Sequence, residues 1–288
     1  MELDYLATVL LSSLSSASVL LIATVGLAIV FGLMGVINLA HGEFIMFGAY
    51  VALFATRNGV PFPLAVVLAS VVTALFGAIV ERAIIRHLYG RILDTLLATW
   101  GLSLVLYQSA VLIFGTVTPG VGMPQSNIEI GNYTLSTYLL FLILVAVVLI
   151  GLLYWLLTRT GYGIVARAAI QDPQTAATIG IESGRINTAT FALGSGLAGF
   201  AGAILLPAFP ATPSMGFAFV IKAFLAVVAA GPVTLSGTVV AGGALGSIAS
   251  MTASFYTTVM GDVVFFLATI TILRIFPLGI SARWRLKL

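Results

Sequence analysis

Long apolar segments recur along the whole chain and constrain its fold more than any other feature. They lie near residues 6–30, 44–56, 63–85, 95–115, 136–157, 187–207, 217–231, 236–258 and 262–277. A helix needs about 20 apolar residues to cross the hydrocarbon core of a bilayer, and most of these segments approach that length. Because the segments are continuous and do not alternate at short spacing, the pattern predicts helices rather than the strands of a membrane barrel.

Polar residues are too scarce for a fold that faces water. Charged residues make up 7% of the chain, whereas soluble domains carry about 25%. We therefore expect an all-α integral membrane protein with a single transmembrane domain over residues 1–288. It would be a polytopic bundle of about eight or nine helices, including broken or re-entrant segments. The segment at 44–56 is too short to span alone, so we expect a half-helix there, joined to the break before it.

Basic residues indicate how the chain is oriented in the membrane. They gather in three polar stretches, at 82–91, 158–186 and 283–287. Since cytoplasmic loops carry an excess of Lys and Arg, these stretches and the C-terminus are predicted to be cytoplasmic. The stretch at 116–135 contains a single charged residue and is predicted to be external. Counting segments back from residue 82 also places the acidic N-terminus outside.

The sequence contains no recognisable catalytic or cofactor motif. It has no cysteine, no phosphate-binding loop that ends in Gly-Lys-Ser/Thr, and its two histidines, His41 and His87, lie on separate segments. We therefore expect no catalytic residue, no metal site and no cofactor. The net charge of +3 is too small to indicate a nucleic-acid partner.

Polar residues between the first two apolar segments are candidates for a pore or gating element. Asn38, His41 and Glu43 lie there beside Gly42, and Gly35 permits a break in the helix. Ionisable groups at membrane depth tend to face a bundle interior or a cavity, and the ends of half-helices offer unpaired backbone groups to a solute. The alternative is a packing cluster in which the histidine and the carboxylate satisfy each other and the broken backbone.

The polar stretch at 158–186 predicts a short cytoplasmic helix. Asp172 can cap a helix that begins at Pro173, where a missing N–H does no harm, and Gly180 fits the helix end. The expected helix therefore spans residues 173–179.

We expect the surface of this short helix to expose Ala176, Ala177 and Ile179. A short helix with an apolar face, presented to the cytoplasm, is suited to docking in a groove of another protein. The alternative is an interfacial helix that rests on the membrane.

Small residues are abundant in the second half of the chain, at 195–202 and 242–247. Such spacing lets helix backbones approach closely in lipid, either within one bundle or across a subunit interface. Two charges accompany these segments. Lys222 is expected to snorkel toward the external side, and Asp262 is expected to mark an external turn.

The chain resembles the permeases of the branched-chain amino-acid and urea uptake family of ABC importers. The resemblance runs over nearly the whole chain and is carried by residues 26–43, with their Asn-x-Ala-His-Gly-Glu run, and by 167–181, 190–202 and 222–228. After the last of these stretches the family usually has Gly-Gly-x-Gly-Ser, whereas this chain has a different sequence with Pro232. The sequence of the glycine-rich stretch at 191–202 is slightly more similar to the urea branch of the family.

The resemblance implies a non-catalytic pore subunit that crosses the cytoplasmic (inner) membrane of a bacterium several times. It would carry branched-chain amino acids, urea or short amides by alternating access. Its implied partners are a second permease subunit, two cytoplasmic ATPase subunits and an external solute-binding protein. The segment at 158–186 would be the loop that contacts the ATPase, and the residues implied in coupling are Arg167, Asp172, Pro173, Ala176, Ala177 and Gly180. The rival interpretations are a passive urea or amide channel and a secondary transporter.

Overall fold

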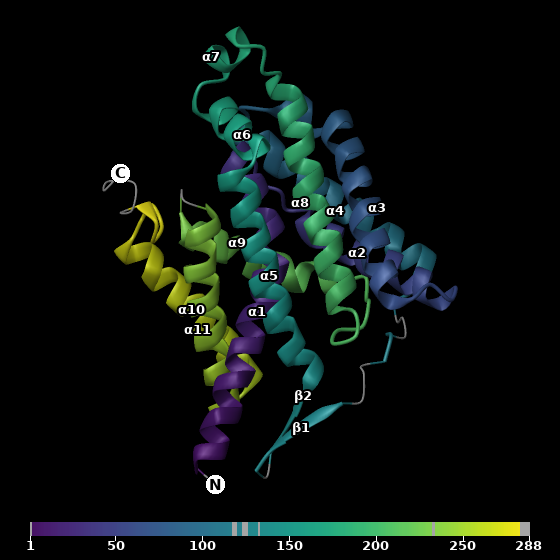
Figure 1. Cartoon of the computed structure of the whole chain (residues 1–288), viewed down its shortest axis with the longest axis vertical. Coiled ribbons are helices and arrows are strands. Elements are labelled where there is room, and N and C mark those ends of the chain that lie inside the picture. The colour runs from purple at the N-terminus through teal and green to yellow at the C-terminus, as the bar shows by residue number, and fades with distance from the viewer. Residues whose placement is uncertain (1, 117–119, 123–125, 132, 232–233, 283–288) are drawn as a thin grey trace. The chain divides into compact units, whose positions relative to one another are not determined.

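Helices make up most of the structure, a computed structural model that describes residues 2–116, 120–122, 126–131, 133–231 and 234–282 (Figure 1). The long helices are α1 (Glu2–Met34), α2 (His41–Arg57), α3 (Phe62–Ala83), α4 (Ile92–Phe114), α5 (Thr137–Arg159), α8 (Ser183–Leu205), α9 (Met215–Ala230), α10 (Thr234–Phe255) and α11 (Thr258–Ile275). The shorter elements are η1 (Ile85–Leu88), β1 (Asn127–Ile130), β2 (Tyr133–Ser136), α6 (Gly161–Gln171) and α7 (Pro173–Thr178).

The prediction of an all-α polytopic membrane protein is confirmed. Each apolar segment of the sequence contains one long helix, and among the described residues 7 helices are long and apolar enough to cross a membrane. The remaining two long helices, α2 and α9, have 17 and 16 residues. The half-helix expected at 44–56 corresponds to α2. It follows a break at residues 35–40, where Gly35 takes a φ of 63°.

Some stretches of the chain for which the sequence made predictions lie partly or wholly outside the described residues. The basic C-terminal tail at 283–287 and the unusual Pro232 are among the residues that the structure does not describe. The described part of the stretch at 116–135 contains an antiparallel hairpin of β1 and β2, in which Ile128 pairs with Leu135. The sequence did not predict this hairpin, because its two strands are only four residues each and an alternation of apolar and polar residues over so short a length resembles the loop around it.

The chain divides into two compact units, each assembled from segments that are distant in sequence. One unit contains residues 1–24, 122–149 and 222–288, and the other contains 25–121 and 150–221. The division follows packing density within the membrane-spanning chain, so the expectation of a single transmembrane domain stays a prediction.

Small residues bring α2, α3 and α8 together in the second unit, where these helices lie side by side (Figure 1). A Cβ added at Gly202 of α8 would lie 2.8 Å from the carbonyl carbon of Ile45 in α2. One turn earlier in α8, a Cβ at Gly199 would lie 2.8 Å from the carbonyl oxygen of Ala69 in α3. The Ser70 hydroxyl of α3 donates a hydrogen bond to the α8 backbone at 2.9 Å. These approaches confirm, for residues 195–202, the interpretation of small residues as packing within the bundle.

In the other unit, opposite ends are held by different contacts. At one end the ring of Tyr5 in α1 lies 5.6 Å from that of Tyr133 in the hairpin. At the other end Ile280 and Ser281 donate backbone hydrogen bonds of 2.9 and 3.0 Å to the last residues of α9. Between these ends an apolar core forms around Leu245 and Phe265.

An ion pair joins α9 to α11 in this unit. Lys222 Nζ lies 2.6 Å from Asp262 Oδ1, and the two side chains are 38% and 45% exposed. The expectation of an external turn at Asp262 is wrong, because α11 already begins at Thr258. Lys222 therefore forms an ion pair with a specific carboxylate. The expectation that it snorkels toward the external side did not include this partner.

We predict that removing either charge of this pair will destabilise the protein more than removing both. Lys222→Met or Asp262→Leu alone leaves an unpaired charge at membrane depth, whereas the double variant leaves none. The cost of each single change should lie between the ~1 kcal/mol of an exposed pair and the ~3 kcal/mol of a buried one. The midpoint of thermal unfolding in detergent measures the difference. A double variant that loses as much as the sum of the single variants would contradict the pairing.

Candidate functional site

The short helix predicted at 173–179 is present as α7, Pro173–Thr178. Asp172 caps it as predicted: its Oδ1 accepts hydrogen bonds from the backbone N–H groups of Gln174 at 3.0 Å and Thr175 at 3.1 Å. The Thr175 hydroxyl donates to Asp172 Oδ2 at 2.5 Å. These hydrogen bonds, led by the one from the Thr175 hydroxyl, hold the pKa of Asp172 below its usual value, so the cap stays ionised. The helix ends before Gly180, whose φ of +85° favours glycine, as expected.

Only part of the predicted apolar surface of α7 is exposed. Ala177 is exposed and Ile179, just beyond the helix, is 72% exposed. Ala176 is 3% exposed, so the expectation that it contributes to the surface is wrong. Successive helical residues point about 100° apart, and the chain folds back over Ala176, whose carbonyl accepts a hydrogen bond of 3.0 Å from the backbone of Ile181.

A second helix, α6, precedes α7 and was not predicted. Thr160 caps it, accepting a 3.4 Å hydrogen bond from the backbone of Gly163. Its buried face consists of small residues three apart, namely Gly163, Ala166 and Ala169. This spacing, together with the capping threonine, is the sequence signal that could have identified the helix.

Two side-chain contacts hold α6 in the second unit. The guanidinium of Arg167, a predicted coupling residue, is exposed and donates to the carbonyl of Leu157 near the end of α5. The hydroxyl of Tyr162 lies 2.8 Å from that of Thr190 in α8, and burial raises the pKa of Tyr162. The tyrosine is therefore a hydrogen-bonding partner of α8.

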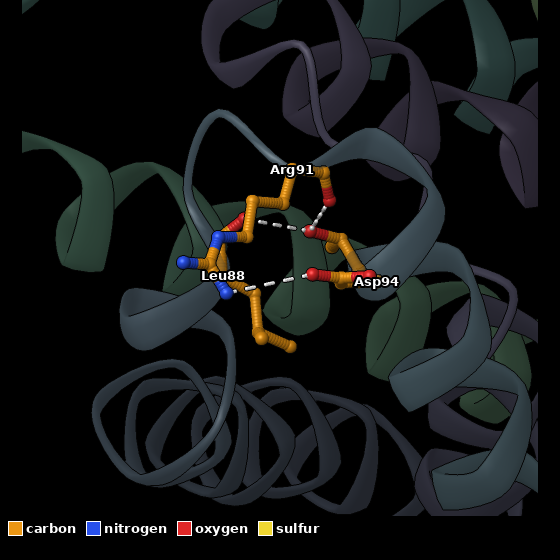
Figure 2. A network of polar contacts seen from close by, with 4 residues as sticks. Leu88, Arg91 and Asp94 are labelled. Atoms are coloured by element: carbon orange, nitrogen blue, oxygen red, sulfur yellow. Dashed lines mark hydrogen bonds and ion pairs between the residues drawn. The ribbon is translucent and has the colours of Figure 1, made fainter.

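The basic loop between α3 and α4 is ordered by a local polar network (Figure 2). Arg91 forms an ion pair of 3.6 Å with Asp94, and the Thr95 hydroxyl donates to the carbonyls of Leu88 and Arg91 at 3.0 and 2.8 Å. The N-cap position of α4 is Arg91, and Asp94 lies in the first turn. An acidic residue in that turn still complements the helix dipole.

The candidate pore residues lie in the interior of the second unit. Asn38, His41 and Glu43 are 2%, 1% and 1% exposed. The Asn38 side-chain oxygen accepts from the backbone of Ala40 at 3.1 Å, which stabilises the break before α2. Thr99 of α4 stabilises the same break. Its hydroxyl accepts a hydrogen bond from the backbone N–H of Leu39 and donates one to the carbonyl of Ile37.

Glu43 meets the beginning of α9 within the same unit. Its Oε1 accepts a 3.2 Å hydrogen bond from Ser103 of α4, and its Oε2 has no hydrogen-bond partner among the described residues. A Cβ added at Gly216 would lie 2.8 Å from both carboxylate oxygens. Gly42 packs against the backbone of Gly216, so both glycines are required for α2 and α9 to approach this closely.

The structure thus brings the four candidate pore residues together and leaves them closely packed. The six coupling residues implied by the resemblance lie in one segment, on α6, at the cap between α6 and α7, on α7 and at the glycine that follows α7. No group of three or more His, Cys, Asp or Glu side chains in the described part of the chain could hold a metal ion. The polar groups described above position the backbone and the helices.

Comparison with known proteins decides the family. The model of the family described as "Branched-chain amino acid transport system / permease component" matches residues 9–273. The chain belongs to this family.

Individual members of the permease family match over almost their full length. The chain is 30% identical to the high-affinity branched-chain amino acid transport system permease protein BraD of Pseudomonas aeruginosa, covering 95% of each protein. It is 27% identical to the corresponding permease protein LivH of Escherichia coli K12, covering 90% of each. It is 28% identical to a probable branched-chain amino acid transport permease protein of Methanocaldococcus jannaschii, covering 92% of this chain and 89% of the relative. No solved structure matches the chain significantly.

Membership of the permease family agrees with the apolar helices of the structure. The chain is a multi-pass membrane component of a transport system, and the resemblance found in its motifs is confirmed. The lean toward the urea branch receives no support, since the relatives named above are all described as branched-chain amino acid permeases.

Proposed function

We propose that this chain is the membrane-spanning subunit of an ATP-driven importer for branched-chain amino acids. The observation that carries this proposal is the family match over residues 9–273, together with a relative that covers 95% of both chains. That relative is described as a permease of a high-affinity branched-chain amino acid transport system. A pore subunit needs partners for energy and for capture of the solute. The proposed partners are a second permease subunit, two cytoplasmic ATPase subunits and an external solute-binding protein.

In this proposal α7 is the docking element for the ATPase. It is capped at its first turn by Asp172, and Ala177 within it and Ile179 just after it offer exposed apolar surface. A capped helix with an apolar face suits a groove on another protein, where preorganisation lowers the entropy lost on binding. Arg167 is exposed on the neighbouring helix α6 and can add a charged contact at the rim.

The orientation that we propose places α7 in the cytoplasm. Two basic stretches, 82–91 and 158–186, meet at one end of the second unit, since Arg86 lies against Gly184 of α8. The positive-inside rule assigns such an end to the cytoplasm. In the other unit the N-terminal part of α1 lies beside the hairpin of β1 and β2, which supports an external position for both.

Burial of Asn38, His41 and Glu43 favours a structural role for these residues over direct contact with the solute. We propose that they stabilise the break between α1 and α2 and its contact with the beginning of α9. Solute selection would then belong mainly to the binding protein, and the pore would move by alternating access. A secondary transporter would need several ionisable groups facing a path, which these closely packed residues do not provide.

The test is uptake by proteoliposomes that contain the chain with the ATPase subunits and binding protein of its own transport system. We expect uptake of leucine, isoleucine and valine that requires ATP and the binding protein. Uptake of leucine that continues without ATP would indicate a channel, and uptake abolished by an ionophore would indicate a secondary transporter. Uptake of urea in place of leucine would overturn the proposed solute while leaving the importer intact.

A further inference from the structure

A buried carboxylate joins three segments at the end of the second unit that carries α7. Glu81 lies in the last turns of α3 and is 0% exposed. Its Oε2 accepts a 2.6 Å hydrogen bond from the hydroxyl of Thr188 in α8. Its Oε1 accepts a hydrogen bond from the hydroxyl of Tyr89, which follows η1. One side chain therefore connects α3, the loop after it and α8.

Both contacts of Glu81 come from hydroxyl donors, so the carboxylate is satisfied at each oxygen. Burial and the hydrogen bond to Glu81 raise the pKa of Tyr89 further above neutrality, in keeping with its hydroxyl acting as a donor to the carboxylate. A buried carboxylate without such donors is costly, and removing a donor leaves an unsatisfied polar atom in the interior. The arrangement therefore favours one position of α8 against α3.

The remaining contacts between α3 and α8 are mainly approaches of small residues. Gly77 packs on Ser195, and Gly199 packs on Thr73 and Ala69. Interfaces of small residues allow packed helices to slide by small amounts. Further along this interface the Ser70 hydroxyl donates a hydrogen bond of 2.9 Å to the carbonyl of Gly196. The hydrogen bonds of Glu81 fix the register at the end nearest α7, because a shift of α8 along α3 would separate Thr188 from the carboxylate.

The hydrogen bonds of Glu81 lie close to α7, where they can transmit a movement of α7 to the bundle. α7 ends at Thr178 and α8 begins at Ser183, so the first turns of α8 receive any displacement of α7. Arg86 of η1 lies against the same turns, since a Cβ at Gly184 would be 3.1 Å from its Nη2. Thr188 lies in the next turn of α8. Glu81 is thus the first buried polar contact beyond the short linker that follows α7.

We infer that Glu81 is a positioning residue that locks the beginning of α8 to the end of α3, so that a displacement of α7 moves α2, α3 and α8 as one body. This inference rests on the proposed role of α7 as the docking element for the ATPase. Without the lock, the first turns of α8 would shift against the end of α3, and part of the movement at α7 would be lost before it reached the pore. The result would be ATP hydrolysis with little transport.

The test uses the complete transporter in proteoliposomes and measures leucine transported per ATP hydrolysed. Thr188→Val keeps the shape of the side chain and removes its donor, and Tyr89→Phe removes the other donor. We expect each variant to retain ATPase association and ATP hydrolysis within roughly twofold, while the transport ratio falls roughly fivefold, the factor that corresponds to one lost hydrogen bond. The double variant should fall further.

Two controls separate a lock from general destabilisation. Thr188→Ser keeps the donor and should give the wild-type ratio, and Ser109→Ala removes a hydroxyl whose hydrogen bond, to the carbonyl of Val105, lies within α4. An unchanged ratio in Thr188→Val, or loss of ATPase association in that variant, would overturn the inference while leaving the importer intact. A wild-type complex without ATP-dependent transport would overturn the proposed function itself, and the inference with it.

Discussion

Gly202→Ala is expected to lower the yield of folded protein sharply and to reduce the free energy of unfolding by about 3 kcal/mol. The added Cβ would lie 2.8 Å from the carbonyl carbon of Ile45 and 2.9 Å from the backbone nitrogen of Ala49. These atoms belong to the backbone of α2 and cannot rotate away as the end of a flexible side chain could. The two helices would have to separate, and dispersion contacts along their whole crossing would weaken.

Gly101→Ala is the matched control for this change. Gly101 lies within α4 in the same unit, and a Cβ there would meet nothing within 4 Å. Alanine is the better helix former by about 1 kcal/mol, so this variant should be neutral or slightly stabilised. The two variants are compared by their midpoints of thermal unfolding in detergent, with the folded fraction measured by size-exclusion chromatography. Equal midpoints for both variants would mean that α2 and α8 do not approach as closely as the structure indicates.

The contrast between these glycines illustrates what the sequence alone predicted. Hydropathy located the long helices, because the length of an apolar run depends only on local composition and bilayer thickness. The run of small residues at 195–202 predicted close packing within the bundle. It did not identify the partners of α8, since Gly202 and Ile45 are separated in the sequence by all the elements from α3 to α7. Which glycine is indispensable therefore emerges only from the packed structure.

The polar contacts were less predictable for the same reason. Asp172 and Gly180 were correctly assigned because a helix cap is a local arrangement with a residue preference of its own. Glu81 and Thr188 are 107 positions apart, and the residues around them give no sign of the contact. The pair of Lys222 and Asp262, 40 positions apart, was missed in the same way. Long-range polar pairs depend on how the helices pack, and local patterns in a single sequence do not predict which helices become neighbours.

Ile179→Glu is expected to abolish transport without unfolding the protein. Ile179 is 72% exposed, so a charge at this position disturbs few contacts within the chain. In a docked complex the same charge would be buried against apolar surface without a partner. Losing an anchor of this kind costs at least ~2 kcal/mol, which corresponds to a loss of affinity for the ATPase of roughly 30-fold or more. Co-purification of the ATPase subunits with the tagged variant measures this loss, and the unfolding midpoint should stay at the wild-type value.

Ile179→Trp distinguishes docking in a protein groove from an interfacial helix resting on lipid. Tryptophan is favoured at the membrane interface, so a helix lying on the bilayer would tolerate it or bind lipid more tightly. A groove shaped for isoleucine would not accommodate the larger ring, and ATPase association would fall as it does for the glutamate variant. Ala176 would be a poor choice for such a test, because it is buried and its substitution would disturb the segment itself. If the tryptophan variant retained full ATPase association and transport while the glutamate variant lost membrane attachment of the segment, α7 would be a lipid-facing helix and the proposed coupling route would fail.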